Sequence, residues 1–293
     1  MDAPASPSPP EYMQGKFETV GQHKLYIIDK GQGPAVLMLH GFPNSSSLYK
    51  HQIPALLTKG FRVIVPDLLG FGESDKPQAV EPYTLDNLVS QLEALLDQLK
   101  VDKVTVVGHD WGAALAWHFA ALLPERTTRL VAISVGHPAQ YFATGLQLQL
   151  SWYMLVFLHQ GVAEQVAVDG SIWARVTPPS QAVHLEAEEF KQMFADIAKP
   201  GAATSGLNWY RANIKPENMI AGYITQTPAV EADSLMIWPT GDHFACCEEQ
   251  AKGSEAFVKG SFRYQRIECD SHFATWFAAE EVNKLLLEFI PTP

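Results

Sequence analysis

The sequence is poor in cysteine. Its 293 residues include only Cys246, Cys247 and Cys269. An odd number of cysteines without regular spacing does not form a disulfide framework, and without a C-x-x-C pair a structural zinc site is disfavoured. We expect the three cysteines to be small, buried hydrophobic residues.

Long apolar runs and an excess of basic residues are also missing. No stretch reaches the roughly 18 uninterrupted apolar residues that cross a membrane. The first ten residues, MDAPASPSPP, lack the basic and apolar parts of a secretion signal, and the final IPTP contains no retention tripeptide. The 32 Asp and Glu outnumber the 21 Lys and Arg, and the formal charge of −11 repels phosphate backbones. We therefore expect a cytoplasmic protein with no membrane or nucleic-acid partner, and the sequence leaves open whether it is a monomer or a dimer.

The composition is that of a large globular domain. Hydrophobic residues make up 47% of the chain and charged residues 18%, and only the Pro- and Ser-rich residues 1–14 are expected to form a flexible tail. Short apolar runs predict strands, several of them buried on both faces of a sheet. These runs are residues 24–29, 35–39, 61–66, 103–107, 129–134, 235–239 and 262–267.

Helical patterns separate these strands. In residues 84–99, apolar residues recur on one face of a helix whose N-cap is Thr84, and residues 280–289 predict a closing helix. The alternation of strands and helices indicates an α/β fold, a mostly parallel sheet flanked by helices. Residues 136–223 break the alternation and are rich in helix formers. We therefore predict a helical cap, inserted into a core of residues 15–135 and 224–293.

A sharp turn follows the fourth apolar run. The strand leads into Gly108-His109-Asp110-Trp111-Gly112, and a helix is predicted from residue 113. Small residues two positions before and after Asp110 suit a tight strand-to-helix turn that projects the middle side chain from the sheet. The N-terminus of the following helix stabilises negative charge there. Asp110 is therefore a candidate nucleophile, although a plain turn with Asp as the helix cap has the same local pattern.

A second loop, His40-Gly41-Phe42-Pro43, follows the run 35–39. Its glycine-containing turn predicts that backbone N–H groups approach the nucleophile. The N–H groups of Phe42 and Trp111 would form an oxyanion hole. We expect His40, Pro43 and Trp111 to line the adjoining substrate pocket.

A candidate acid and a candidate base follow the last two predicted strands. Asp242 comes after the run 235–239, and His272 comes after the run 262–267. The chain order of nucleophile, acid and histidine is that of the α/β-hydrolase fold. Asp270 competes for the acid role, but it lies only two residues from His272. His109 and His243 are weaker candidates for the base.

An aspartate nucleophile determines the type of reaction. A carboxylate displaces a leaving group at an sp3 carbon and forms an alkyl ester on Asp110. His272, oriented by Asp242, then activates the water that hydrolyses the ester. Both steps use side chains and water, so we expect no metal or organic cofactor. A halide leaving group needs N–H donors, whereas an epoxide oxygen needs acidic O–H donors such as phenols.

These motifs resemble the soluble epoxide hydrolase branch of the α/β-hydrolases. The resemblance extends over nearly the whole chain after the tail and includes DLLGFGES at residues 67–74 and NWYR at residues 208–211. It implies that a small epoxide and water react to give a vicinal diol, and that two cap tyrosines bind the epoxide oxygen. Tyr210 matches one of them by its flanking residues. Tyr153, eight residues before Gly161, matches the other by spacing.

The sequence departs from this family near the acid and the base. Ser271 and Phe273 flank His272 where the family usually has Gly and Trp, and two cysteines at residues 246–247 follow the acid. A haloalkane dehalogenase has the same fold and is the main alternative, but that family usually has Asn at the position of Phe42. An esterase is disfavoured because no serine occupies the turn. A non-catalytic receptor on this fold would bind ligand and release no diol.

Overall fold

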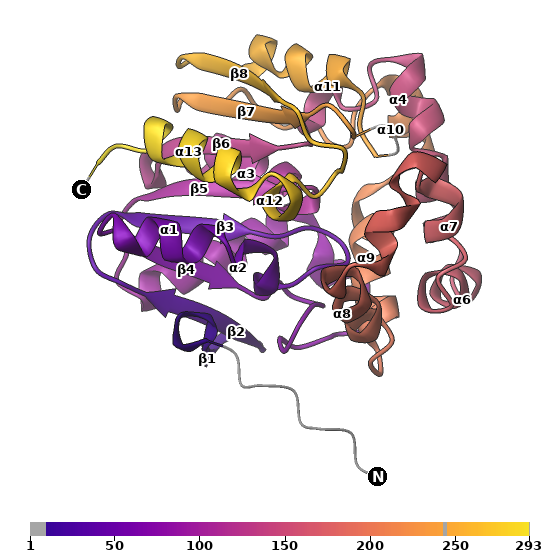
Figure 1. Ribbon diagram of the computed structural model, residues 1–293, viewed down its shortest axis with the longest axis horizontal. Helices are drawn as coiled ribbons and strands as arrows, with labels where there is room; N and C mark the ends of the chain where they lie inside the picture. The colour runs from indigo at the N-terminus through magenta and orange to yellow at the C-terminus, as the bar shows by residue number, and fades with distance from the viewer. Residues whose placement is uncertain (1–9, 243–244, 293) are drawn as a thin grey trace.

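The strands form one eight-stranded sheet (Figure 1). A computed structural model describes residues 10–242 and 245–292. Across the sheet the strands follow the order β1-β2-β4-β3-β5-β6-β7-β8. Their bounds are β1 (Lys16–Val20), β2 (His23–Lys30), β3 (Ala35–Leu39), β4 (Arg62–Pro66), β5 (Val104–His109), β6 (Thr127–Ile133), β7 (Ser234–Pro239) and β8 (Phe262–Ile267).

The strand directions confirm a mostly parallel sheet. β2 runs antiparallel to its neighbours β1 and β4, whereas all neighbours from β4 to β8 are parallel. β3 and β5 are buried along their whole length, as expected of strands covered on both faces. The carboxyl ends of β3, β5, β7 and β8 therefore meet at one edge of the sheet, where open α/β sheets hold their sites.

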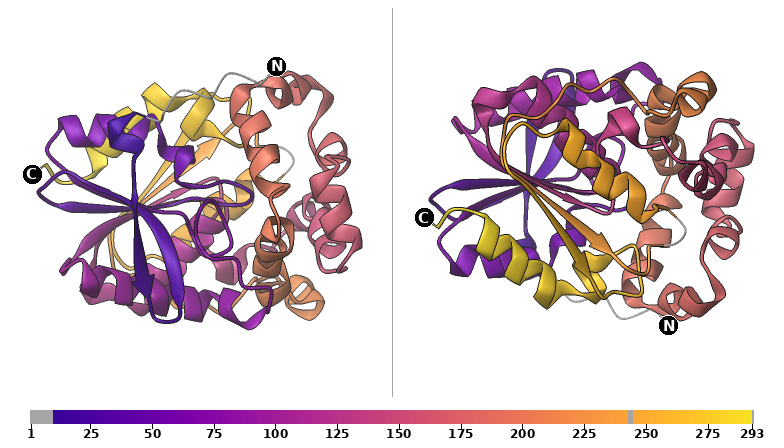
Figure 2. Two further views of the ribbon diagram at one scale, coloured as in Figure 1. Left: turned by 90° about the horizontal axis from the view of Figure 1, so that it is seen from below. Right: turned by 90° about the horizontal axis from the view of Figure 1, so that it is seen from above.

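Helices cover both faces of the sheet (Figure 2). Residues of α2 and α3 pack with Leu37 and Leu39 of β3, whereas residues of α1 and α13 pack with Val36 and Met38 of the same strand. Alternate residues of one strand thus belong to two apolar cores. The bounds of the core helices are η1 (Glu11–Met13), η2 (Ser46–Tyr49), α1 (Gln52–Thr58), η3 (Glu81–Tyr83), α2 (Leu85–Gln98), α3 (Trp111–Leu122), η4 (Pro124–Arg126), α11 (Glu248–Lys252), η7 (Gly253–Phe257), α12 (Ala274–Phe277) and α13 (Ala279–Phe289).

The chain between β6 and β7 forms helices that lie at one end of the sheet, at the right in Figure 1. We call residues 136–223 the helical insertion. Its helices are η5 (Pro138–Gln140), α4 (Gly145–Leu150), α5 (Trp152–Phe157), α6 (Val162–Val168), α7 (Trp173–Val176), η6 (Pro179–Glu186), α8 (Glu188–Ile197), α9 (Ala202–Asn213) and α10 (Pro216–Ala221). In the part of the chain that the structure describes, no helix has the length and apolar character of a membrane span.

The structure confirms one predicted segment end and corrects another. The N-cap predicted for the first long helix is confirmed, because Oγ1 of Thr84 accepts a 3.3 Å hydrogen bond from the N–H of Asn87. The tail predicted for residues 1–14 needs correction. Residues 1–9 lie outside the described residues, but Glu11–Met13 form η1, and Tyr12 and Met13 pack against the apolar core because both carry large apolar side chains.

Candidate active site

Asp110 occupies the turn between β5 and α3. Its backbone has φ 55° and ψ −125°, a positive-φ conformation that costs a non-glycine residue about 1–3 kcal/mol. The flanking glycines make the turn possible. A Cβ atom at Gly108 would collide with the backbone of Gly112, and one at Gly112 would collide with the end of β3. The chain thus holds a buried carboxylate at the carboxyl edge of the sheet, in the kind of turn that its sequence predicts.

The loop after β3 closes on Asp110. The N–H of Phe42 donates a 2.8 Å hydrogen bond to Oδ1 of Asp110. This approach requires Gly41, since a Cβ atom at that position would overlap the Asp110 side chain. The backbone N–H of Trp111, the first residue of α3, also faces the carboxylate and helps to lower its pKa. One backbone N–H therefore binds the carboxylate and a second one faces it, as an oxyanion hole requires.

His272 lies between two carboxylates. Its Nδ1 is 2.7 Å from Oδ2 of Asp242, and its Nε2 is 3.6 Å from Oδ2 of Asp110. Asp242 is fully buried, and its Oδ1 accepts hydrogen bonds from the N–H groups of Ala245 and Cys246 at 3.3 and 3.2 Å. The structure therefore brings together the three residues that the sequence proposes as nucleophile, acid and base.

The charges of these groups stabilise one another. Burial alone would raise the pKa of Asp110, but its contacts with His272 outweigh burial and hold the pKa below its ordinary value. Burial alone would lower the pKa of His272, but the carboxylates of Asp242 and Asp110 raise this pKa to about 10. In the free protein at neutral pH, Asp110 is therefore ionised and His272 is protonated.

The backbone carbonyl of His272 has two side-chain partners. Nε2 of His109 lies 3.0 Å from this oxygen, and the hydroxyl of Ser134 donates to it at 3.2 Å. Burial lowers the pKa of His109 to about 4, so its ring is neutral. The sequence offers His109 as a weaker candidate for the base, but the structure places it against the backbone of His272, the stronger candidate.

Tyr153 of α5 and Tyr210 of α9 line the same cavity as Asp110 and His272. Both rings are buried, and their centroids are 6.4 Å apart. Burial raises the pKa of both phenols well above the ordinary value, and the nearby Asp110 carboxylate acts in the same direction. Both tyrosines therefore keep their hydroxyl protons, and the helical insertion supplies two O–H donors beside the carboxylate.

Two small cavities meet at Asp110. The one shared with the two tyrosines has a volume of about 20 Å³. The other, of about 10 Å³, is lined by residues including Trp111, Tyr141 and Met154. Spaces of this size hold about one water molecule each. In this conformation the pocket is therefore closed around its own aromatic side chains.

The structure corrects the pocket lining predicted from the His-Gly-Phe-Pro loop. Trp111 lines the smaller cavity, but His40 and Pro43 are buried away from the linings of both. Nε2 of His40 accepts a 2.9 Å hydrogen bond from the N–H of Leu68, and its Nδ1 lies 3.0 Å from the carbonyl oxygen of Gly41. Its ring therefore bonds to the backbone of its own loop and of the segment after β4.

Asp270, the alternative candidate for the acid, has a different partner from Asp242. Asp270 is exposed, and its Oδ1 accepts a 3.2 Å hydrogen bond from the side-chain amide of Gln181. Asp242, in contrast, is the carboxylate bonded to Nδ1 of His272. His243, the other candidate base, lies outside the described residues.

Polar residues of the helical insertion hold the loop that follows Asp242. The buried amide of Gln147 donates to the carbonyl of Ala245 at 2.8 Å and accepts from the N–H of Cys247 at 2.9 Å. The hydroxyl of Tyr141 donates to the same carbonyl of Ala245 at 3.0 Å. The sequence gives no sign of these residues. No local pattern marks them, because their partners lie 98 to 104 residues further along the chain.

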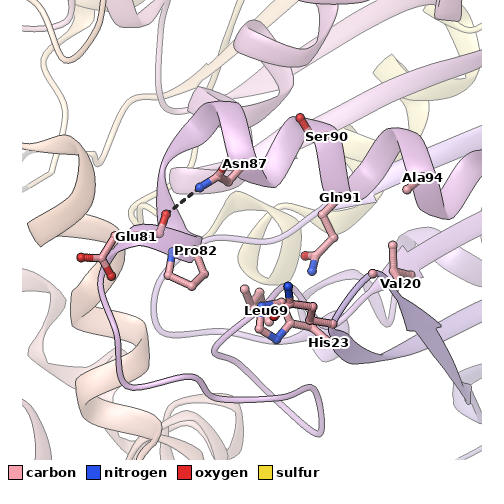
Figure 3. A pocket seen from close by; sticks show the side chains of 11 residues that line it. Val20, His23, Leu69, Glu81, Pro82, Asn87, Ser90, Gln91 and Ala94 are labelled. Atoms are coloured by element: carbon pink, nitrogen blue, oxygen red, sulfur yellow. Dashed lines mark hydrogen bonds between the residues drawn. The ribbon is translucent and has the colours of Figure 1, made fainter.

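A larger hollow lies elsewhere on the core (Figure 3). Its volume is about 580 Å³, and its lining includes His23 at the start of β2 and Asn87 and Gln91 of α2. The side-chain amide of Asn87 donates to the carbonyl of Glu81 at 2.8 Å. None of the predicted site residues lines this hollow. Buried, mutually perturbed titratable groups, rather than size, therefore identify the candidate active site.

The cysteines are buried free thiols, as expected. Within residues 10–242 and 245–292, the side chains placed to hold a metal ion together are Asp242, Cys246 and His272, whose ligand atoms lie within 4.8 Å of one another. Two of the three are the candidate acid and base, so a metal ion there would replace their mutual hydrogen bond.

Comparison with known proteins identifies the family. Residues 34–279 match the family described as alpha/beta hydrolase fold. The chain belongs to this family, and the predicted fold class is confirmed.

Several individual relatives of the chain within this family are named as epoxide hydrolases. The chain is 35% identical over 304 residues to Epoxide hydrolase 2 of Siraitia grosvenorii, in an alignment covering 91% of this chain and 94% of that protein. It is 32% identical over 283 residues to AB hydrolase superfamily protein YfhM of Bacillus subtilis (strain 168), with the same coverage. Among solved structures, an epoxide hydrolase from hot-environment metagenomes has a TM-score of 0.83 at 29% identity, covering 95% of this chain and 99% of that one. The predicted resemblance to epoxide hydrolases is confirmed.

Proposed function

We propose that the protein is an epoxide hydrolase that converts small-molecule epoxides to vicinal diols. The observation that carries this proposal is the one cavity lined by the Asp110 carboxylate, the His272 ring and the phenols of Tyr153 and Tyr210. A carboxylate suits attack on an sp3 carbon, and two O–H donors suit an alkoxide leaving group. The epoxide hydrolases among its relatives and structural neighbours support the same activity.

In the first half of the reaction, Asp110 attacks the epoxide. Its Oδ1 is bonded to the N–H of Phe42, so we assign the attack to Oδ2. A bond forms between Oδ2 and one epoxide carbon, and the bond from that carbon to the epoxide oxygen breaks. The oxygen takes the electron pair and receives a proton from Tyr153 or Tyr210. The products are a hydroxyalkyl ester on Asp110 and a tyrosinate.

Formation of the ester converts His272 into a base. In the free protein the carboxylates of Asp110 and Asp242 raise the pKa of His272. Esterification removes the charge of Asp110, so the imidazolium loses one of its two stabilising partners. Its proton then returns the tyrosinate to the phenol, and the neutral imidazole is ready to accept a proton from water.

In the second half of the reaction, water hydrolyses the ester. His272 takes one proton, and the water oxygen attacks the carbonyl carbon of the Asp110 ester. Negative charge develops on the oxygen that the N–H of Phe42 binds, and the N–H of Trp111 faces the same carboxylate, which stabilises the tetrahedral intermediate. The bond to the alkyl oxygen then breaks, and the diol leaves with the remaining water proton. Asp110 is again ionised, and Asp242 stabilises the protonated His272.

We further propose that the helical insertion, residues 136–223, is the cap of this active site, and that residues 15–135 and 224–293 form the core. Both proposed proton donors, Tyr153 and Tyr210, come from the insertion. Gln147 of the insertion bonds to the loop that carries Asp242. The cap therefore contributes donors to the first half of the reaction and support for the second.

A haloalkane dehalogenase uses the same aspartate and histidine, but it needs N–H donors for the halide. The side chain of Phe42 donates no hydrogen bond, and its ring packs against those of Phe157 and Tyr210 at 5.6 and 5.3 Å. The cavity instead contains two phenols. These features favour an alkoxide over a halide as the leaving group.

A two-panel assay of the purified protein tests the proposal. Aryl and aliphatic epoxides are scored for diol, and matching chloro- and bromoalkanes are scored for halide, with Asp110→Ala as the control. We expect diol formation that is lost in the control, and no halide. Halide release without diol would replace the proposed function by dehalogenation. If the protein releases neither diol nor halide, but epoxides raise its melting temperature, the result would favour the non-catalytic receptor.

A further inference from the structure

The thiol of Cys246 lies close to the candidate acid, Asp242, and the candidate base, His272. Sγ of Cys246, a carboxylate oxygen of Asp242 and a ring nitrogen of His272 all lie within 4.8 Å of one another, and all three residues are buried. The sequence singles out Cys246 as a departure from the family, and the proposed reaction gives its side chain no role. Its described polar contact is a 3.5 Å approach to the hydroxyl of Tyr141.

The chemistry of these three groups is that of a site for a thiophilic divalent cation. Zinc and cadmium bind thiolate, imidazole and carboxylate together, with ligand distances of about 2.0–2.3 Å in a tetrahedral arrangement. Tetrahedral ligands at such distances lie roughly 3.3–3.7 Å from one another. The 2.7 Å contact between Nδ1 of His272 and Oδ2 of Asp242 would need to open by roughly 0.6–1.0 Å to admit an ion.

One side of this group borders the active-site cavity. His272 lines the cavity of about 20 Å³ at Asp110, and so does Ala245, the residue before Cys246. The burial of the three ligands excludes competing water, which strengthens the bonds of a cation to a thiolate and a carboxylate.

We propose that Asp242, Cys246 and His272 form an inhibitory site for Zn²⁺ or Cd²⁺. The ion forms bonds to Sγ of Cys246, Nδ1 of His272 and a carboxylate oxygen of Asp242. The thiol proton and the Nδ1 proton leave to solvent, and the hydrogen bond between His272 and Asp242 is lost. No group is oxidised or reduced, and the fourth position of the ion remains for water.

The position of this site predicts a specific kind of inhibition, and this prediction depends on the proposed function. A His272 ring that binds the ion through Nδ1 retains its other proton on Nε2, the nitrogen that faces Asp110 at 3.6 Å. It then accepts no proton from water. The attack of Asp110 on the epoxide uses neither Nδ1 nor Nε2 of His272. The ion therefore blocks hydrolysis of the ester while ester formation continues.

Binding of Cd²⁺ to the purified full-length protein tests the site without any substrate. Equilibrium dialysis counts the bound ions, and the ultraviolet sulfur-to-cadmium charge-transfer band reports thiolate coordination. We expect one ion per chain with this band. Replacing a ligand should weaken binding by about 100-fold or more, because losing even a group that only supports a ligand costs roughly 10–100-fold. Cys246→Ser and Cys246→Ala should therefore lose the band, whereas Cys247→Ala and Cys269→Ala should keep it.

Unchanged Cd²⁺ binding in either Cys246 variant would overturn the proposal, as would a band that disappears in the Cys247 or Cys269 variant. X-ray absorption of cadmium bound to the unaltered protein keeps the proposal testable even if the Cys246 variants do not fold. One sulfur and several lighter neighbours are expected, and two sulfurs would contradict the site.

The inhibition experiment separates this proposal from the proposed function. With an epoxide that the protein hydrolyses, added Cd²⁺ should stop diol release and leave a substrate-sized adduct in the intact-protein mass spectrum. Binding of Cd²⁺ by a protein that hydrolyses no epoxide would support the site and remove the proposed function. Epoxide hydrolysis that Cd²⁺ does not affect would remove the inhibitory site and leave the function intact.

Discussion

The N–H of Phe42 donates a 2.8 Å hydrogen bond to Oδ1 of Asp110. The two residues are 68 positions apart in the sequence, and the parallel pairing of β3 with β5 brings them together. Because Gly41 has no side chain, the loop approaches the carboxylate closely enough for this bond. In the proposed reaction, this contact orients the Asp110 carboxylate before attack and stabilises its carbonyl oxygen in the ester.

Gly41→Ala should therefore disrupt the reaction. The added methyl group would overlap the side chain of Asp110 and displace either the carboxylate or the Phe42 N–H. A displacement of about 1 Å at reacting groups costs roughly 100-fold in rate, and we expect a loss of at least that size in kcat/KM for epoxides. Gly145→Ala is the matched control, because a Cβ atom there meets nothing within 4 Å. Equal losses of kcat/KM in Gly41→Ala and Gly145→Ala would show that the loss does not come from displacement at Asp110, and would contradict the prediction.

His272→Gln should permit ester formation and block ester hydrolysis. Asp110 still has the N–H of Phe42 as a donor to its carboxylate, but no base remains to activate water. Intact-protein mass spectrometry after addition of an epoxide should show one substrate-sized adduct, located on Asp110 by peptide mapping. Asp110→Asn serves as the control and should show no adduct. An unmodified His272→Gln protein would argue against a covalent intermediate.

Tyr210→Phe should slow the first half of the reaction more than the second. The variant keeps the ring, which packs against Trp111 at a centroid distance of 5.1 Å, but removes one of the two proton donors. Loss of a general acid costs about 100-fold or more. Stopped-flow fluorescence of the neighbouring tryptophan should show this loss in the alkylation rate. Tyr264→Phe is the control, since its hydroxyl donates to Glu248 in the core. An unchanged alkylation rate would remove Tyr210 from the donor role.

His137 should make the fold sensitive to acid. Burial lowers the pKa of His137 to about 4, and the neighbouring His118 acts in the same direction. The unfolded chain, with an ordinary histidine pKa of about 6.5, therefore binds more protons between pH 6.5 and 4. The stabilising effect of the neutral ring is fully present above about pH 6.5 and falls by up to about 3 kcal/mol as the pH approaches 4.

Urea unfolding of the wild-type protein and of His137→Gln at pH 7 and pH 5 tests this dependence. The variant should be less stable at pH 7, because it loses the 4.5 Å stacking of the ring on Phe257. It should also lose less stability between the two pH values. His159→Gln, a change at an exposed histidine, should leave the pH dependence as in the wild type. Identical pH dependence in His137→Gln and wild type would contradict the prediction.

The interior of the fold was predictable because its apolar patterns are local and strong. The run 35–39 is β3, buried at every residue, and the pattern of residues 84–99 corresponds to α2. β1 gives no such signal. It is an edge strand with mostly exposed or partly exposed residues, and its sequence KFETV mixes charged and apolar side chains. An edge strand forms through pairing with β2, which a local pattern does not reveal.

The candidate site was predictable where its residues lie in a motif or directly after a strand. Asp110, Asp242 and His272 satisfy this condition, and the structure brings them within hydrogen-bond or near-contact distance. His40 satisfies it too, yet its ring bonds to the backbone instead of lining the cavity. Gln147 follows no motif, and its partners are loop atoms of a distant segment. Position in a motif therefore predicts proximity to the site, but it does not predict the direction in which a side chain points.

The most direct test of the central claim, nucleophilic attack by Asp110, is a single turnover in water enriched in oxygen-18. With protein in excess over epoxide, the new oxygen of the diol should come from the Asp110 carboxylate and carry no label. The label should appear instead in the Asp110 side chain, detected by mass spectrometry of the peptide that contains it. A labelled diol from the first turnover, with an unlabelled Asp110, would show that water attacks the epoxide directly and would contradict the account.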